Sequence, residues 1–86
     1  MKTDKNSNFE KANLSDANLR GANLRWVNLQ EANLSGSNLM RADLHESNLK
    51  ETNLFGTNLK MSDGLTQSQI DQAQTNETTE LPNILE

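Results

Sequence analysis

The stretch ANLSDANLRGANLRWVNLQEANLSGSNLM, residues 12–40, places a leucine at every fifth position. Each of these leucines directly follows an asparagine. An α-helix turns by about 100° per residue, so a five-residue step would scatter the leucines around its axis. In a straight strand the same odd step would send successive leucines to opposite faces. The chain must therefore change direction once every five residues to bring these leucines together.

The other positions of each five-residue unit agree with such a turn. Two residues before each central position the side chain is small or β-branched, which lets it share an interior with leucine. The two residues after it are mostly polar or glycine, which suits a corner. Eleven consecutive units, from Ser7 to Met61, follow the pattern without an insertion. Their central residues form the predicted core: Phe9, Leu14, Leu19, Leu24, Leu29, Leu34, Leu39, Leu44, Leu49, Leu54 and Leu59.

Taken over the whole chain, the composition is poor in core-forming residues. Leu, Ile, Val and Phe together account for 18 of 86 residues, close to the range in which chains stay disordered. There is no cysteine, so neither a disulfide nor a thiolate metal site can stabilise the fold. The chain has no apolar run of membrane length and no signal-like start, and we expect a cytoplasmic protein.

The repeats resemble those of the pentapeptide repeat family, whose motif is A-(D/N)-L-x-x. The clearest match is Ala12-Asn13-Leu14-Ser15-Asp16, and the resemblance covers about two thirds of the chain. It implies an all-β fold, a right-handed quadrilateral β-helix of about three coils, with four pentapeptides per coil. Residues twenty apart would then stack on one another. We divide the chain into an N-terminal extension (1–6), the β-helix (7–64) and a C-terminal capping helix with a tail (65–86).

The pattern after Gly64 predicts the cap. Thr66 and Gln69 fit a capping box, and Leu65 and Ile70 fit the hydrophobic staple around it. We predict a short helix over residues 67–74 that carries these apolar side chains and Ala73 onto the last coil. Residues 76–80 are expected to form a loop, and residues 81–85 a second apolar contact.

Two further expectations concern the ends of the coil. Phe55, in the last full coil, is expected to lie under the C-terminal tail. The first coil, headed by Phe9, has only six residues before it and is the less protected end. A homodimer through this N-terminal coil is therefore a candidate assembly.

A candidate interaction surface lies where four outward residues would meet. By the twenty-residue rule Arg25 neighbours His45, and Trp26 neighbours Glu46. Exposed tryptophan and arginine are favoured as interface anchors. The alternative is that Trp26 covers its own corner or packs against Arg25.

No residue set predicts catalysis. Asp43, His45 and Glu46 could each bind a metal, but Asp43 occupies the Asn/Asp position of the motif and a site needs ligands from more than one segment. We therefore predict no metal, no cofactor and no enzymatic activity. We interpret Asp43, His45 and Glu46 as residues of a solvated corner.

The best understood members of the family mimic duplex DNA with an acidic β-helix and bind type II topoisomerases such as gyrase. That mechanism requires negative charge along the rod, whereas residues 7–61 hold six acids and six bases. Nucleic-acid binding is not predicted either, because Met40 and Glu46 interrupt the bases Arg20, Arg25 and Lys60. We therefore predict a non-catalytic structural or protein-interaction module, with a protein partner, no nucleic acid and no membrane, and keep the DNA mimic as the alternative.

Overall fold

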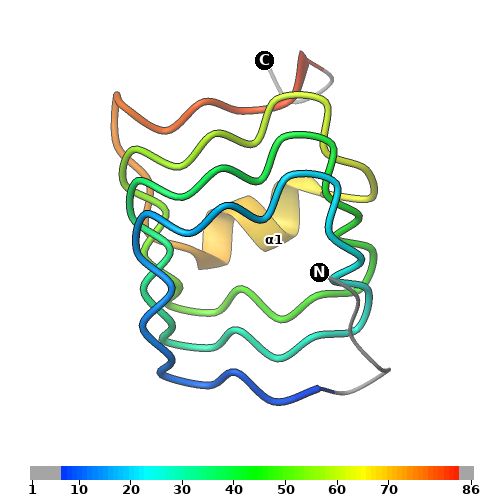
Figure 1. Cartoon of the computed structure of the whole chain (residues 1–86), viewed down its shortest axis with the longest axis vertical. Coiled ribbons are helices and arrows are strands. Elements are labelled where there is room, and N and C mark those ends of the chain that lie inside the picture. The colour runs from blue at the N-terminus through cyan, green and yellow to red at the C-terminus, as the bar shows by residue number, and fades with distance from the viewer. Residues whose placement is uncertain (1–6, 84–86) are drawn as a thin grey trace.

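Main-chain hydrogen bonds between residues about twenty apart stack the repeats into coils. The computed structural model describes residues 7–83, and Figure 1 shows the coils as superposed four-sided loops. The N–H of Leu14, for example, donates to the carbonyl of Asn33 at 2.8 Å. Isolated parallel bridges join the Asn/Asp positions of successive coils rather than long strands. These bridges pair Asn8 with Asn28, Asn13 with Asn33, Asn18 with Asn38, Asn23 with Asp43, Asn28 with Asn48, Asn33 with Asn53, Asn38 with Asn58, and Asp43 with Asp63.

The corner after each central residue is a tight turn. The N–H three residues after the central position donates back to its carbonyl in all eleven units, as Ala32 does to Leu29 at 2.9 Å. The residue before that donor always has a positive φ, close to +60° in eight non-glycine residues and +70° in three glycines. Only glycine adopts this conformation without a steric cost. The eight non-glycine corners are Lys11, Asp16, Trp26, Glu31, Arg41, Glu46, Glu51 and Met61.

The asparagine before each central residue has a specific role in this corner. Its side-chain oxygen accepts a hydrogen bond from the N–H two residues later, at 2.9–3.3 Å, in every one of the eleven units, with Asp43 replacing asparagine once. This is the Asx-turn geometry for which asparagine and aspartate are favoured.

Every N–H of a middle unit, residues 27–31, is therefore satisfied. The N–H of residue 27 donates within the preceding corner, and that of residue 28 donates to Ser7 in the coil before. The N–H groups of residues 29 and 31 donate to Asn48 and Lys50 in the coil after, and that of residue 30 donates to the side chain of Asn28. Unpaired main-chain groups are costly when buried, and this unit leaves no N–H unpaired.

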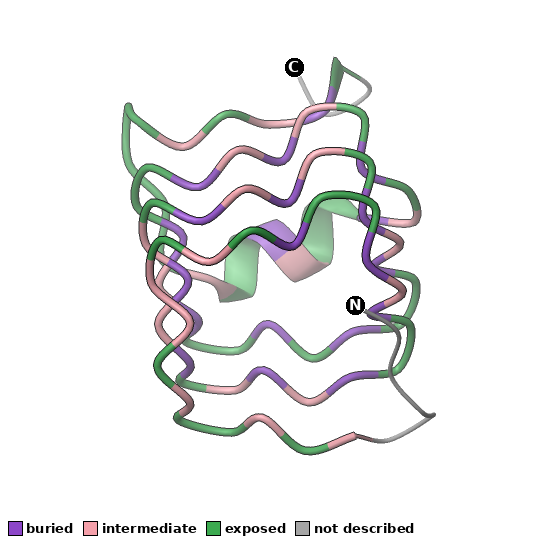
Figure 2. Cartoon of the chain, in the orientation of Figure 1, coloured by how far each residue is buried: buried purple, intermediate pink, exposed green. Residues whose placement is uncertain are grey.

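The core is a column of leucines inside the coil, with small residues beside them. Figure 2 shows buried positions recurring along each side of the coil, while the corners are exposed. Leu24, Leu34, Leu44 and Leu54 are at most 1% exposed. Inward hydroxyls are accommodated by hydrogen bonds, since Thr52 donates to the carbonyl of Leu29 and Thr57 to that of Leu34, both at 2.7 Å.

The two ends of the coil differ. Phe9 and Leu14, in the first coil, are only partly buried and pack against the core from its edge. At the other end the helix α1 (Gln67–Gln72) lies across the four-sided opening in the view of Figure 1. Leu65 and Ile70 join the buried core at 4% and 5% exposure, and Ala73 packs against it partly buried.

A capping box begins the helix. The Thr66 hydroxyl accepts from the N–H of Gln69 at 3.2 Å, and the Gln69 side chain accepts from the N–H of Thr66 at 2.8 Å. The amide nitrogen of Gln69 also donates to the carbonyl of Ser47 at 3.0 Å. One side chain therefore both caps α1 and joins it to the coil.

The tail differs from our sequence-based expectation in two respects. The helix ends at Gln72 rather than at residue 74, because Gln74 pairs with Asn53 in the ladder. Residues 76–80 are not all loop, since Glu80 pairs with Asn58. In both places a residue of the tail pairs with the otherwise unpaired main-chain edge of the last coil. The predicted contacts of residues 84 and 85, and the extension 1–6, lie outside the described residues.

Phe55 is a further correction, because it is 41% exposed rather than covered by the tail. The tail pairs with Asn53 and Asn58 on either side of this corner, and Thr78 and Thr79 pass beside Gly56 and Leu54. The Phe55 side chain is nevertheless left exposed.

Replacing Leu34 by lysine should abolish the fold. Leu34 is 0% exposed, and a buried ammonium without a partner costs about 5 kcal/mol or more, comparable to the stability of a small domain. Circular dichroism should show loss of the cooperative thermal transition. Phe55→Lys places the same charge at an outward position and should melt like the parent chain. An unchanged melting temperature for Leu34→Lys would contradict the buried column.

Deleting residues 65–86 should cause association through the exposed edge and core of the last coil. Size-exclusion chromatography with light scattering would detect it as higher mass or aggregation. Gln69→Ala is the graded control, because it removes the capping contacts but leaves Leu65 and Ile70 in place; it should lower the melting temperature and remain monomeric. A truncated chain that stays monomeric and equally stable would show that the tail has no capping role.

Candidate interaction surface

Two successive corners form the predicted surface, which we call the Trp26 corner: Arg25, Trp26, His45 and Glu46. The N–H of Trp26 donates to the carbonyl of His45 at 2.9 Å, so the two corners are directly joined across neighbouring coils. All four residues are exposed. The structure therefore places the four side chains on one edge of the rod.

Asp43 is the electrostatic centre of this edge. Its carboxylate lies 3.4 Å from Arg25 Nη1 and 2.6 Å from His45 Nδ1, and it also accepts from the N–H of His45 at 3.1 Å. Partial burial by itself would raise the pKa of Asp43. The hydrogen bonds from His45, with the charges of His45 and Arg25, outweigh burial and hold that pKa below its usual value of 3.8.

Trp26 lies on the other side of the same corner. It has a φ of +63°, the conformation that glycine adopts in three other corners, and is 41% exposed. With Glu46 and Val27 it lines a shallow hollow of about 390 Å³ beside Asn28 and Asn48. Arg25 forms an ion pair with Asp43 at 3.4 Å.

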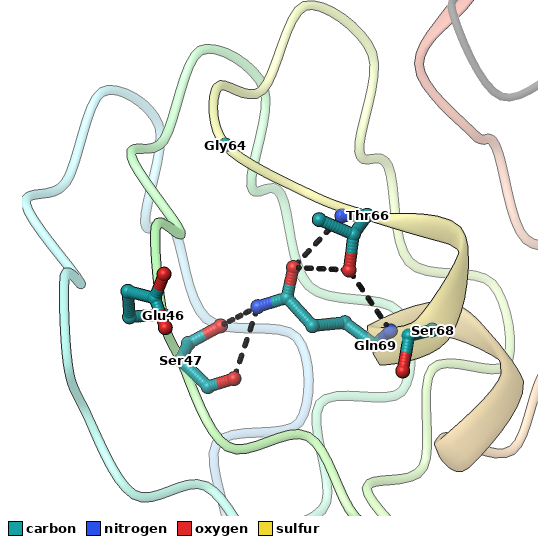
Figure 3. Close-up of a pocket in the computed structure, with 6 residues that line it drawn as sticks. All are labelled: Glu46, Ser47, Gly64, Thr66, Ser68 and Gln69. Carbon is teal, nitrogen blue, oxygen red and sulfur yellow. Dashed lines mark hydrogen bonds between the residues drawn. The ribbon is translucent and has the colours of Figure 1, made fainter.

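The cap adjoins this corner. Figure 3 shows a second hollow, of about 250 Å³, in which Glu46 and Ser47 face Gln69 and Thr66 at the start of α1. Gly64, which has a φ of +83°, lies against His45, because a Cβ on it would clash with the imidazole ring and the main-chain nitrogen of His45. Only glycine fits there. The position of His45 is therefore coupled to the point where the repeats end.

The three potential metal ligands of the sequence are not brought together as one site. Within residues 7–83 no group of three His, Cys, Asp or Glu side chains is placed to hold a metal ion. His45 and Asp43 face each other, whereas Glu46 borders the hollows beside Trp26 and α1. No helix in the described part of the chain is long and apolar enough to cross a membrane.

Sequence reasoning missed the role of Asp43. It was interpreted as a variant of the asparagine motif, and its side chain does accept the corner hydrogen bond like the asparagines. One signal was available in the sequence. Asp43 is the one aspartate at the Asn/Asp position of the eleven units, it precedes the only histidine of the sequence by two residues, and it follows Arg25 by eighteen. Gly64, in the central position of what would be a twelfth unit, was a second signal.

The repeated corners and ladder define the class of protein. The model of the family described as pentapeptide repeats (8 copies) matches residues 5–36 and 22–60. These matches cover more than half of the chain, and the protein belongs to the pentapeptide repeat family, whose members are right-handed β-helices.

Two solved structures are similar to this chain. A pentapeptide repeat protein from Nostoc Pcc 7120, alr5209, is 25% identical, with a TM-score of 0.44 over 90% of this chain and 67% of that one. The pentapeptide repeat protein Rfr23 from the cyanobacterium Cyanothece 51142 is 30% identical, with a TM-score of 0.48 over 86% of this chain and 56% of that one. The chain thus spans little more than half the length of Rfr23. No curated protein matches.

Asp43→Asn should lower stability near neutral pH while keeping the corner hydrogen bond, because asparagine fills this position in the other units. A lowered pKa stabilises the folded state above the unfolded pKa, and the effect is lost as pH falls through the folded pKa. We expect a deficit of about 0.5–1 kcal/mol at pH 7. Melting curves between pH 7 and pH 2 would measure it, and the two proteins should converge as Asp43 becomes protonated.

Asn33→Asp is the matched control for this measurement. It puts a carboxylate at the same motif position, where the side chain of Asn33 accepts from the N–H of Ser35 at 2.9 Å. It should show no gain in stability at neutral pH. Equal melting temperatures for Asp43→Asn and the parent at pH 7 would contradict the role of Asp43.

Proposed function

We propose that the chain is a non-catalytic structural or protein-interaction module and that a cytoplasmic protein partner contacts the Trp26 corner. The observation that carries this proposal is the position of Trp26. An indole that is 41% exposed sits in a left-handed corner, where it adds nothing to the leucine core. Such a residue stores backbone strain of about 1 kcal/mol, which glycine would avoid. Seven other corners carry the same strain, but Trp26 is the one that displays a tryptophan, a residue type favoured as an interface anchor.

The surroundings of Trp26 support the same proposal. Asp43 holds Arg25 and His45 in place, so the polar part of the corner loses little side-chain freedom when a partner binds. The hollow beside the indole, lined by Glu46, Asn28 and Asn48, offers side-chain carbonyl and carboxylate oxygens as acceptors around an apolar centre. An aromatic anchor within a polar rim is typical of a protein interface.

The distribution of charge argues against the DNA-mimic alternative. The outward corner positions of residues 20, 21, 40, 41, 60 and 61 hold three bases and no acid. Lys11 lies 4.0 Å from Glu31 on the opposite part of the rod, so the acids there are partly neutralised. A mimic of duplex DNA needs a continuous negative surface.

Trp26→Ala should abolish capture of the partner from an extract of the source cell while the melting temperature stays within about 2 °C of the parent. Phe55→Ala is the matched control, because Phe55 is also 41% exposed but lies on a different corner. Quantitative mass spectrometry of the captured proteins would compare the parent with both variants. The partner should be retained by Phe55→Ala and lost by Trp26→Ala.

Two results would overturn the proposal. Retention of the same captured proteins by Trp26→Ala would remove the Trp26 corner from the interface. Inhibition of gyrase supercoiling at low protein concentration that disappears on adding salt would favour the DNA mimic, because distributed charge is screened by salt. We expect no such inhibition.

A further inference from the structure

A second hollow surface lies at the C-terminal end of the coil. This C-terminal groove, of about 410 Å³, lies between the last outward corner and the tail and is lined by Met40, Lys60, Met61, Ser62, Asp63 and Pro82, among others. It is separate from the Trp26 corner, with which it shares no lining residue. Three features of the groove indicate what it binds.

The first feature is an adaptable apolar wall. Met61 is 58% exposed, and Met40 and Pro82 line the same groove. Methionine side chains are flexible and polarizable, so they adapt to apolar groups of different shapes. A single apolar side chain from a partner fits such a wall better than a uniformly polar ligand.

The second feature is a buried hydroxyl without a partner. Ser62 is only 8% exposed, yet its hydroxyl makes no hydrogen bond within residues 7–83. The equivalent inward hydroxyls of Thr52 and Thr57 donate to leucine carbonyls. Buried polar groups are nearly always hydrogen-bonded. This oxygen has almost no accessible surface, so the main chain of an extended peptide in the groove would pair with it only after Met61 or Pro82 moves aside.

The third feature is charge. The corner that borders the groove displays Arg20, Arg41 and Lys60 and no acid on three successive coils, and of these bases Lys60 lines the groove itself. The N–H of Arg41 donates to the carbonyl of Lys60 at 3.1 Å, and Arg20 Nη1 donates to Met40 Sδ at 3.1 Å. In the described part of the chain neither arginine forms an ion pair. Carboxylates of a partner complement this rim.

Asp63 selects between anionic partners. It lines the groove together with Lys60, and there it would repel the closely spaced phosphates of a nucleic acid but leave room for an apolar side chain between separated carboxylates. The charge pattern therefore favours a peptide over a polyphosphate chain.

We infer that the C-terminal groove binds an extended acidic peptide segment of a partner protein, with one apolar side chain between Met40 and Met61 and carboxylates against Arg20, Arg41 and Lys60. This inference rests on the proposed interaction role but uses a different surface. A negative peptide titration would not contradict the proposal for the Trp26 corner. A negative Trp26→Ala capture experiment would not contradict the proposal for the groove.

The test uses the full chain labelled with ¹³C at its methionine methyl groups, Met1, Met40 and Met61. The probe is a synthetic pentapeptide with one leucine between two pairs of glutamates. Titration to about 1 mM, a range typical of short peptides, should shift the methyl signals of Met40 and Met61. A control peptide with serine in place of leucine should cause at least about tenfold less shift at the same concentration.

Two sets of variants test the rim and the hydroxyl. Arg41→Glu with Lys60→Glu should weaken peptide binding by at least about tenfold. Lys11→Glu with Lys50→Glu makes the same change of net charge on another corner and should leave binding within about twofold of the parent. Ser62→Ala should weaken binding without lowering the melting temperature, because the removed hydroxyl has no partner in the described chain.

Each contrary outcome overturns the inference in a specific way. An equal response to a decathymidylate oligonucleotide would assign the groove to polyanions. Methionine shifts that depend on protein concentration without peptide would assign it to a second copy of the chain. Peptide binding that appears only after removal of residues 84–86 would assign it to the chain's own C-terminus. Binding unchanged by the Arg41 and Lys60 reversal would remove the basic rim from recognition.

Discussion

The corner that follows each central residue is the constraint on which the rest of the structure depends. It combines a main-chain hydrogen bond across the corner, a left-handed residue, and a side-chain oxygen that accepts the N–H two residues after the asparagine. The remaining N–H groups of the unit are thereby directed along the rod toward the coils before and after. Only with this corner does a five-residue leucine spacing give a shared interior.

The backbone accepts strain at these corners to gain this arrangement. Eight of the eleven left-handed positions are not glycine, although each costs free energy relative to glycine. Two hydrogen bonds fix each corner from both sides, and the coil neighbours hold it in place. The benefit is that corner side chains are displayed on the surface at no cost to the core, and Trp26, Arg41 and Met61 are all displayed in this way.

The sequence predicted the periodic part of the structure and missed the parts that break the period. The leucine column and the capping box of Thr66 and Gln69 follow from local spacing, and the twenty-residue neighbours follow from the resemblance to the pentapeptide repeat family. The end of α1 at Gln72 did not, because it depends on competition from the open edge above Asn53. The charge cluster around Asp43 was also missed, since the aspartate occupies a position that the motif already explains.

The tail shows how the repetition ends. Gln74 pairs twenty-one residues after Asn53, and Glu80 pairs twenty-two after Asn58, whereas every earlier bridge spans twenty. Helix α1 and its flanking residues occupy the place of the next repeat unit, and the drift in spacing prevents a further coil from forming in register.

The four-sided winding gives the interior and the exterior two different periods. Inside, every unit is alike, so the core repeats after five residues; outside, residues meet only those twenty positions away. Inserting one extra pentapeptide would leave the leucine column and the corners intact, but it would rotate everything after it by a quarter turn. If the insertion fell between residues 26 and 39, Arg25 would no longer neighbour His45, and Arg20 would no longer neighbour Met40. In such a chain, an insertion can change which side chains are neighbours on the surface while the packing of the core stays the same.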